Sequence, residues 1–216
     1  MILKERVIEE IKRENIPFNV ISGRYRKDSL MEEYVDNSNF VDDLDIVVYC
    51  EESFFDKKMI DCKKLKKNSQ GNYTYTYDNN ECLCVDVYFT WLSSLGFRFC
   101  APKINNNEDY LYDEDYLSYL LIDPLMKFGQ YKIRHLYQIN CYKQEGVLNN
   151  PHIYRSIPWF LFPLYKNIVN KVNRGDLYMS QTFLNNMKVI LLLYQLRFPP
   201  IFVKKVINSF VVRYQL

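Results

Sequence analysis

Two short segments of the sequence carry carboxylates at a spacing suited to metal-dependent chemistry. Asp43 and Asp45 open the apolar run 44–49, and Asp86 lies inside the later run 83–90. Side chains alternate between the two faces of a strand, so Asp43 and Asp45 share one face while the apolar residues share the other. Carboxylates placed side by side repel each other unless a cation lies between them. The pattern therefore predicts a cation site on the polar face.

The second run repeats this arrangement, because its apolar residues alternate with Asp86. If the two runs are neighbouring strands, three carboxylates converge on one patch. Hard divalent cations such as Mg²⁺ or Mn²⁺ take oxygen ligands and keep positions open for substrate phosphates. Two such ions activate an attacking hydroxyl and stabilise a leaving pyrophosphate. No Ser/His or Cys/His pairing lies near these segments.

A structural interpretation stands beside the catalytic one. An Asp-x-Asp sequence arises easily by chance in a chain with 26 acidic residues. Asp43 and Asp45 would then be an acidic strand start, and Asp86 a coincidence. Two features favour chemistry: the acids precede their strand, unlike the Asp-x-Asp of many glycosyltransferases, and Asp86 recurs in an equivalent setting.

The elements that would position these residues follow from hydrophobic periodicity. We expect strands over 18–21, 44–49, 73–77 and 83–90, with 78–81 joining the last two as a hairpin. A charged helix or loop covers 51–71. We expect helices over 3–15, 116–143, 158–172, 180–196 and 200–214. The Asn- and acid-rich stretch 105–115 suggests two domains, an α/β domain over 1–104 and a helical domain over 105–216.

A glycine-containing turn, Ser22-Gly23-Arg24, follows the first expected strand and precedes both aspartate-bearing segments. Together with Asp43-Leu44-Asp45 and Asp86, it resembles the DNA polymerase beta-type nucleotidyltransferase superfamily over roughly residues 18–90. The resemblance implies an α+β fold, a nucleotidyltransferase-like mixed sheet with flanking helices, followed by a C-terminal helical domain. It places the active site in the cleft between the two. Arg24 stands where the family has a serine.

The resemblance also implies roles for these residues. Asp43 and Asp45 would bind both Mg²⁺ (or Mn²⁺) ions, and Asp86 would ligate the ion on the attacking side and help deprotonate the acceptor hydroxyl. Ser22, Gly23 and Arg24 would hold the phosphates of a nucleoside triphosphate. The acceptor stays open between RNA, protein and glycan.

Lys132 and Arg134 are candidate phosphate contacts in the helical half. Their alternative role is that of a solvated helix face.

Two further functions remain open. The segment 39–46 (NFVDDLDI) resembles the acidic segment of the fukutin-like and bacterial phosphocholine-transferase branch, which implies transfer of a phospho-alditol or phosphocholine from a CDP-activated donor onto a glycan. The other is a catalytically inactive module that keeps the fold to bind nucleic acid or protein.

Composition limits these functions only broadly. Among 216 residues, 48% are hydrophobic and 25% charged, which excludes a disordered chain. A net charge of +2 excludes a surface that is basic throughout but permits a local basic groove. Tyr, Asn and Lys abound while Ala101 is the sole alanine, a bias typical of an A/T-rich genome such as that of a virus or a low-GC organism. We therefore give aromatic residues and asparagines little weight as functional signals.

The expected setting is cytoplasmic. The first residues mix charges at helical spacing and show no secretory signal, and no apolar stretch reaches the roughly 20 residues that a membrane span needs. We expect the six cysteines to be reduced and structural.

Overall fold

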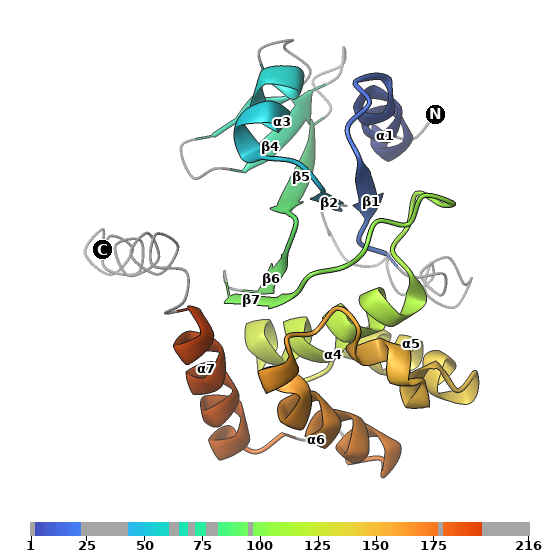
Figure 1. Cartoon of the computed structure of the whole chain (residues 1–216), viewed down its shortest axis with the longest axis vertical. Helices are drawn as coiled ribbons and strands as arrows, with labels where there is room; N and C mark the ends of the chain where they lie inside the picture. The colour runs from blue at the N-terminus through green and yellow to red at the C-terminus, as the bar shows by residue number, and fades with distance from the viewer. Residues whose placement is uncertain are drawn as a thin grey trace. The chain divides into compact units, whose positions relative to one another are not determined.

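A mixed five-stranded sheet and a set of helices make up the part of the chain that the computed structural model describes, residues 3–22, 43–60, 65–68, 72–76, 82–94, 97–176 and 179–195. The strands are β1 (Phe18–Val20), β2 (Leu44–Val48), β3 (Lys66–Lys67), β4 (Tyr73–Thr76), β5 (Cys82–Phe89), β6 (Leu92–Ser94) and β7 (Phe97–Cys100) (Figure 1). The α-helices are α1 (Leu3–Arg13), α3 (Glu52–Met59), α4 (Asp113–Phe128), α5 (Ile133–Gln144), α6 (Phe162–Asn173) and α7 (Gln181–Gln195). Short 3₁₀ turns are η2 (Val147–Asn149), η3 (Pro151–Tyr154) and η4 (Trp159–Leu161).

The chain divides into two units. The sheet unit comprises residues 1–92 and 101–116, and the helical unit comprises 93–100 and 117–216. Relative to the boundary expected after residue 104, the helical unit takes in 93–100 and the sheet unit keeps 105–116. Each unit is described by itself below.

The strand order in the sheet unit is β1-β2-β5-β4-β3. β2 and β5 pair in parallel, whereas β1 with β2, β5 with β4, and β4 with β3 pair antiparallel. The antiparallel pairing of β4 with β5 agrees with the expected hairpin, whose connection at 78–81 lies outside the described residues.

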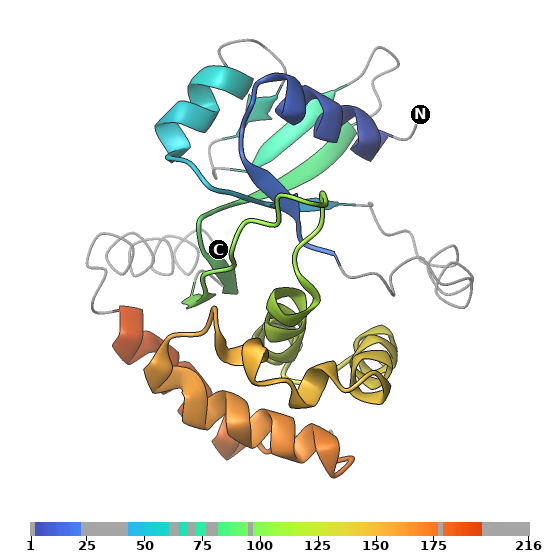
Figure 2. The ribbon, with the colours of Figure 1, turned by 45° about the vertical axis from the view of Figure 1, so that its right-hand side comes forward.

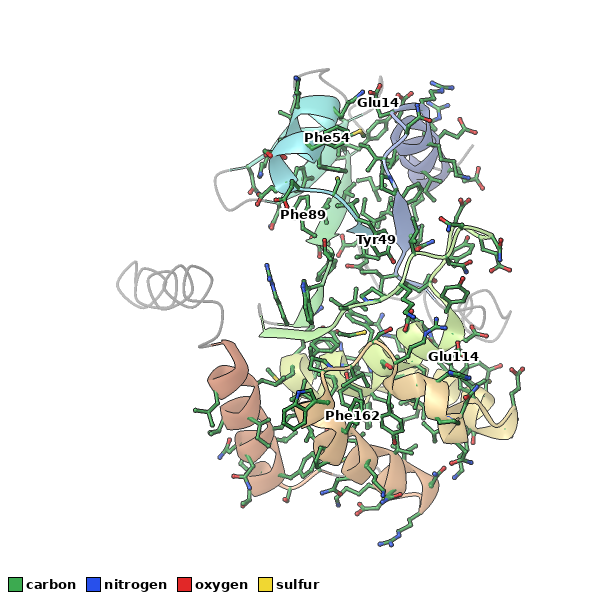
Figure 3. The ribbon with its side chains drawn as sticks, in the orientation of Figure 1. Glu14, Tyr49, Phe54, Phe89, Glu114 and Phe162 are labelled. Atoms are coloured by element: carbon green, nitrogen blue, oxygen red, sulfur yellow. The ribbon has the colours of Figure 1, made fainter. Side chains whose placement is uncertain are left out.

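One face of this sheet is covered by α1 and α3. Helix α1 presents Val7 and Ile11, one turn apart, and α3 presents Phe55 and Met59 at the same spacing; all four are fully buried. These side chains pack with apolar residues of β1, β2, β4 and β5 in one core. Phe89, labelled in Figure 3, closes the end of this core with its ring 5.8 Å from that of Phe55.

The segment after β7 returns to the sheet unit and lies beside β1, the edge strand (Figure 2). The Val20 N–H donates to the Asp109 carbonyl at 2.6 Å, and the Leu111 N–H donates to the Val20 carbonyl at 3.2 Å. The edge of β1 is thereby hydrogen-bonded and protected from pairing with another chain.

The helical unit has its own apolar core, to which α4 contributes Leu117, Leu121 and Leu125 at intervals of one turn. Buried polar groups in this core are satisfied locally. The Tyr165 hydroxyl donates to the Ser118 carbonyl at 3.1 Å, and the Ser118 hydroxyl donates to a carbonyl of η3 at 2.8 Å. Burial raises the pKa of Tyr165 well above its ordinary value, so this hydroxyl stays protonated as a donor.

Most expected elements are confirmed, but the single helix over 116–143 is wrong. The chain forms α4 and α5 instead, and α4 ends at Gly129, whose φ of 70° lies in the left-handed region that terminates helices. The strands β3, β6 and β7 were not expected, and the helix expected over 200–214 lies outside the described residues.

Among the described residues no helix combines the length and apolar character that crossing a membrane requires. The five described cysteines, Cys50, Cys82, Cys84, Cys100 and Cys141, are free thiols.

Candidate functional site

The parallel pairing of β2 with β5 sets two of the three expected carboxylates side by side. In this register Asp45 lies opposite Asp86, and the flanking residues Leu44 and Ile46 lie opposite Val85 and Val87. Side chains directly opposite each other on neighbouring strands have Cβ atoms about 5 Å apart. Asp45 and Asp86 therefore lie next to each other on one face of the sheet.

The expected division of faces is confirmed. Leu44, Ile46, Leu83 and Val85 all belong to the core under α1 and α3 and are at most 4% exposed. The two aspartates are partly exposed on the opposite face, and Asp43, directly before β2, is exposed. The apolar face fixes the register of both strands, since a slip of one residue would move the aspartates into the core.

The thiol of Cys84 reports on the electrostatics of this face. Burial raises its pKa, and Asp86, Asp43 and Asp45 raise it further, in that order. All three carboxylates therefore act on one point of β5, and their combined field is negative there. The thiol stays protonated at neutral pH, which makes Cys84 neither a nucleophile nor a thiolate ligand.

Of the expected phosphate-binding turn, the structure describes Ser22; Gly23 and Arg24 lie outside the described residues. The N–H of Ile21, which precedes Ser22, donates to the carbonyl of Asp45 at 2.9 Å. Ser22 itself is buried, with 5% exposure, and its N–H donates to the Val20 carbonyl at 3.0 Å. The chain leaving β1 thus passes beside the backbone of Asp45.

The donor chemistry of this site fits a magnesium ion held jointly with a substrate. Within the described residues, which include all three aspartates, no three His, Cys, Asp or Glu side chains are grouped so that they could hold a metal ion, so the expected convergence of Asp43 with the pair is not seen. Mg²⁺ typically keeps several waters and binds through one or two carboxylates together with substrate phosphates. Asp45 and Asp86 supply such a pair, and Asp43 stands at its exposed end.

Lys132 and Arg134, the other expected phosphate contacts, belong to the helical unit at the start of α5. Lys132 precedes the first turn of the helix, and Arg134 is exposed within that turn.

An open groove of about 350 Å³ lies elsewhere in the sheet unit, between 15–18 and 104–109. None of the three aspartates lines it.

Asn19 is a buried residue that sequence reasoning missed. Its Nδ2 donates to the carbonyls of Asn105 and Glu108, each at 3.0 Å, and its Oδ1 accepts from the Asn105 N–H at 2.8 Å and the Tyr49 hydroxyl at 3.1 Å. A side-chain amide offers two donors and two acceptor positions, so all four are used. Tyr49, labelled in Figure 3, follows β2, so Asn19 joins the ends of β1 and β2 to the segment 105–109.

No protein-family model, no curated protein and no solved structure matches this chain.

Proposed function

We propose that the chain is a Mg²⁺-dependent nucleotidyltransferase that transfers a nucleoside monophosphate from a nucleoside triphosphate to a hydroxyl acceptor. The observation that carries this proposal is the placement of Asp45 opposite Asp86 on neighbouring parallel strands. Asp43 stands two residues before Asp45 on the same face. A structural sheet gains nothing from two carboxylates in direct register, because like charges opposite each other are destabilising.

The bound cations would supply Lewis acidity at the α-phosphate and neutralise the developing charge on the pyrophosphate oxygens. Asp43, Asp45 and Asp86 would hold them. Asp86 would accept the proton of the acceptor hydroxyl as that oxygen forms a bond to the α-phosphorus. The bond between the α-phosphorus and its bridging oxygen breaks, and pyrophosphate leaves.

The backbone beside Asp45 gives the proposal a second support. The Ile21 N–H donates to the Asp45 carbonyl, so the residue before Ser22 is held against the backbone of Asp45. In the proposed reaction this turn contacts the phosphates of the triphosphate.

The test is a transfer assay with the full chain, Mg²⁺ and each α-³²P nucleoside triphosphate, offered an RNA oligonucleotide, a denatured protein and an oligosaccharide. We expect label on one acceptor, and a loss of at least about 10³-fold in Asp45→Asn and Asp86→Asn, the size typical of lost metal or acid–base groups. Glu9→Gln is the matched control, because Glu9 is an exposed acid of α1 outside the site. Its activity should equal that of wild type.

Folding is checked in the same variants. Replacing one carboxylate of the pair relieves repulsion, so Asp45→Asn should be as stable as wild type or more stable. If label is transferred from a labelled CDP-alditol but from none of the nucleoside triphosphates, the glycan-directed transferase replaces this proposal. Transfer that is unchanged in Asp45→Asn and Asp86→Asn would refute the site.

A further inference from the structure

The two units carry opposite charge, a feature that the net charge of +2 conceals. The sheet unit has 14 Lys and Arg against 23 Asp and Glu, a net charge of −9. The helical unit has 14 Lys and Arg against three acids, a net charge of +11. A charge excess of this size in one unit raises the local concentration of polyanions and speeds their association.

The corner between α4 and α5, residues 127–135, gathers cations around an exposed aromatic ring. Phe128 ends α4 and is 44% exposed. The Nζ atom of Lys132 lies 3.8 Å from the centre of its ring. The ring of His135 stacks against Phe128 with centroids 6.3 Å apart and planes 17° apart. Lys132 and the buried imidazole thus both contact the Phe128 ring, and the residue stays partly open to solvent.

Arg134 and Lys127 complete this corner. The Nε atom of Arg134 lies 3.3 Å from Nε2 of His135, and the N–H of Lys132 donates to Nδ1 of the same ring at 3.1 Å. Lys127 lies 3.2 Å from a carboxylate oxygen of Asp123. Asp123 is the only acid between residues 117 and 144, so the corner keeps an excess of positive charge.

The response of His135 supports this reading of the charges. Burial, followed by the charges of Arg134, Lys132 and Lys127 in that order, lowers its pKa to about 4. All three cations therefore act on one point, and the imidazole behind Phe128 is neutral at physiological pH. The positive charge of the corner resides on the side chains of Lys127, Lys132 and Arg134.

We propose that the α4–α5 corner of the helical unit binds single-stranded nucleic acid, with Lys127, Lys132 and Arg134 contacting phosphates and Phe128 stacking on a base. Exposed aromatic rings flanked by cations bind single strands through stacking and phosphate contacts together. The charge of +11 on the unit supplies long-range attraction for the same ligand. This proposal does not depend on the proposed transferase activity.

A single strand suits this corner better than an anionic membrane does. The cations surround one flat ring at the junction of two helices, whereas membrane-binding helices present a long apolar stripe with cations along its margins. Ile133 is 68% exposed beside the ring and would also contact lipid, so vesicles form a separate arm of the test.

The test measures fluorescence anisotropy of labelled U₂₀ and dT₂₀ oligonucleotides with the full chain, between about 50 and 200 mM salt. Wild type should bind, and its affinity should fall as salt rises. Lys132→Glu/Arg134→Glu should weaken binding at least tenfold. It should also reduce the slope of log K against log salt by about 1.4, since each single-strand phosphate contact contributes about 0.7. Phe128→Ala should weaken binding about fivefold or more, the effect of losing one stacked base.

The matched control is Arg174→Glu/Lys188→Glu, which makes the same charge change at two other exposed positions of the helical unit. It should retain most of the affinity. Circular dichroism checks folding, and Lys132→Gln/Arg134→Gln replaces the charge-reversal variant if that one is unfolded. Asp45→Asn/Asp86→Asn should bind RNA like wild type without nucleotide or Mg²⁺, which separates this proposal from the transferase.

Three results would overturn the proposal. The first is binding by Lys132→Glu/Arg134→Glu that equals wild type, and the second is an equal loss in the control pair. The third is binding to vesicles of 30% phosphatidylserine with no binding to either oligonucleotide.

Discussion

The sheet unit and the helical unit handle charge in different ways. In the sheet unit several described cations lie against acids: Lys12 lies 2.7 Å from Asp109, and Lys67 lies 2.7 Å from Glu52 and 2.6 Å from Asp56. In the helical unit the α4–α5 corner instead gathers three cations around one neutral imidazole. The ion pairs of the sheet unit stabilise its fold. The three cations of the α4–α5 corner repel one another, and the fold of the helical unit holds them close together despite this repulsion.

The sheet unit contains one departure from its own rule. Asp45 and Asp86 are like charges in direct register, whereas Lys12 and Lys67 of the same unit lie against acids. Each unit therefore keeps one group of like charges together, acidic in one and basic in the other. The two proposals assign to each group a ligand of opposite charge, a cation with a triphosphate in the first and a polyanion in the second.

The largest expected effect on stability concerns Asn19, a buried residue of the sheet unit whose side-chain amide makes four hydrogen bonds. Asn19→Leu should lower the free energy of unfolding by about 3 kcal/mol, because it leaves buried backbone groups of 105–108 without partners. Urea denaturation monitored by circular dichroism measures the change. Asn106→Ala, at an exposed position of the same segment, should change it little. Equal stability of the Asn19 variant and wild type would show that this network does not hold the segment.

An effect of similar size is expected from pH at the basic corner. The folded-state pKa of His135 is about 4, below the unfolded value of 6.5. The unfolded chain therefore binds a proton between these pH values while the folded chain does not. Stability is fully present above pH 6.5 and is lost as pH falls toward 4, by up to about 3 kcal/mol.

Urea denaturation between pH 4 and 7 tests this, with His135→Asn as the comparison. Asn retains an acceptor for the Lys132 N–H but does not titrate. The variant should lose much of the decline that wild type shows over this range. Parallel curves for the two proteins would mean that the cations do not act on His135 as described.

The smallest effect concerns the ion pairs of the sheet unit. Lys67 bridges Glu52 and Asp56, and the Tyr73 hydroxyl donates to Asp56 at 2.7 Å. Burial alone would lower the pKa of Lys67, but its hydrogen bonds to Asp56 and Glu52 outweigh burial and raise it. Lys67→Met should cost about 1 kcal/mol, a value that allows for solvent screening of a partly exposed pair.

Lys57→Met, an exposed lysine of α3, is the control for this change and should be neutral. The difference between the two variants should shrink in 1 M NaCl, because salt screens the pair. If the Lys67 variant is as stable as wild type, these ion pairs do not contribute to stability, and packing alone stabilises the β3 segment.

The sequence predicts β2 and β5, the two strands that carry Asp45 and Asp86, well for a simple physical reason. In 44–49 and 83–90 the alternation of apolar and polar residues is strict, and a buried face admits one register only. The neighbouring placement of Asp45 and Asp86 was a condition of the hypothesis, and the parallel pairing of β2 with β5 meets it. The role of the aspartates stays a prediction.

Other features depend on long-range partners that periodicity does not encode. Asn19 acts through residues about 86 positions away, and an A/T-biased composition hid it among many asparagines. The break at Gly129 escaped notice because the apolar pattern continues across it. The opposite charges of the two units nearly cancel in the net charge of the chain. The expected boundary after residue 104 also assigned 93–100 and 105–116 to the wrong units.

The most direct test of the central claim is Mn²⁺ binding in the presence of ATP, followed by the electron paramagnetic resonance signal of the free ion. The full chain should bind Mn²⁺ more tightly with nucleotide than without, and Asp45→Asn/Asp86→Asn should weaken that binding at least tenfold. Glu5→Gln/Glu9→Gln removes two exposed acids of α1 and should bind like wild type. Equal Mn²⁺ affinity in wild type and Asp45→Asn/Asp86→Asn would contradict the account.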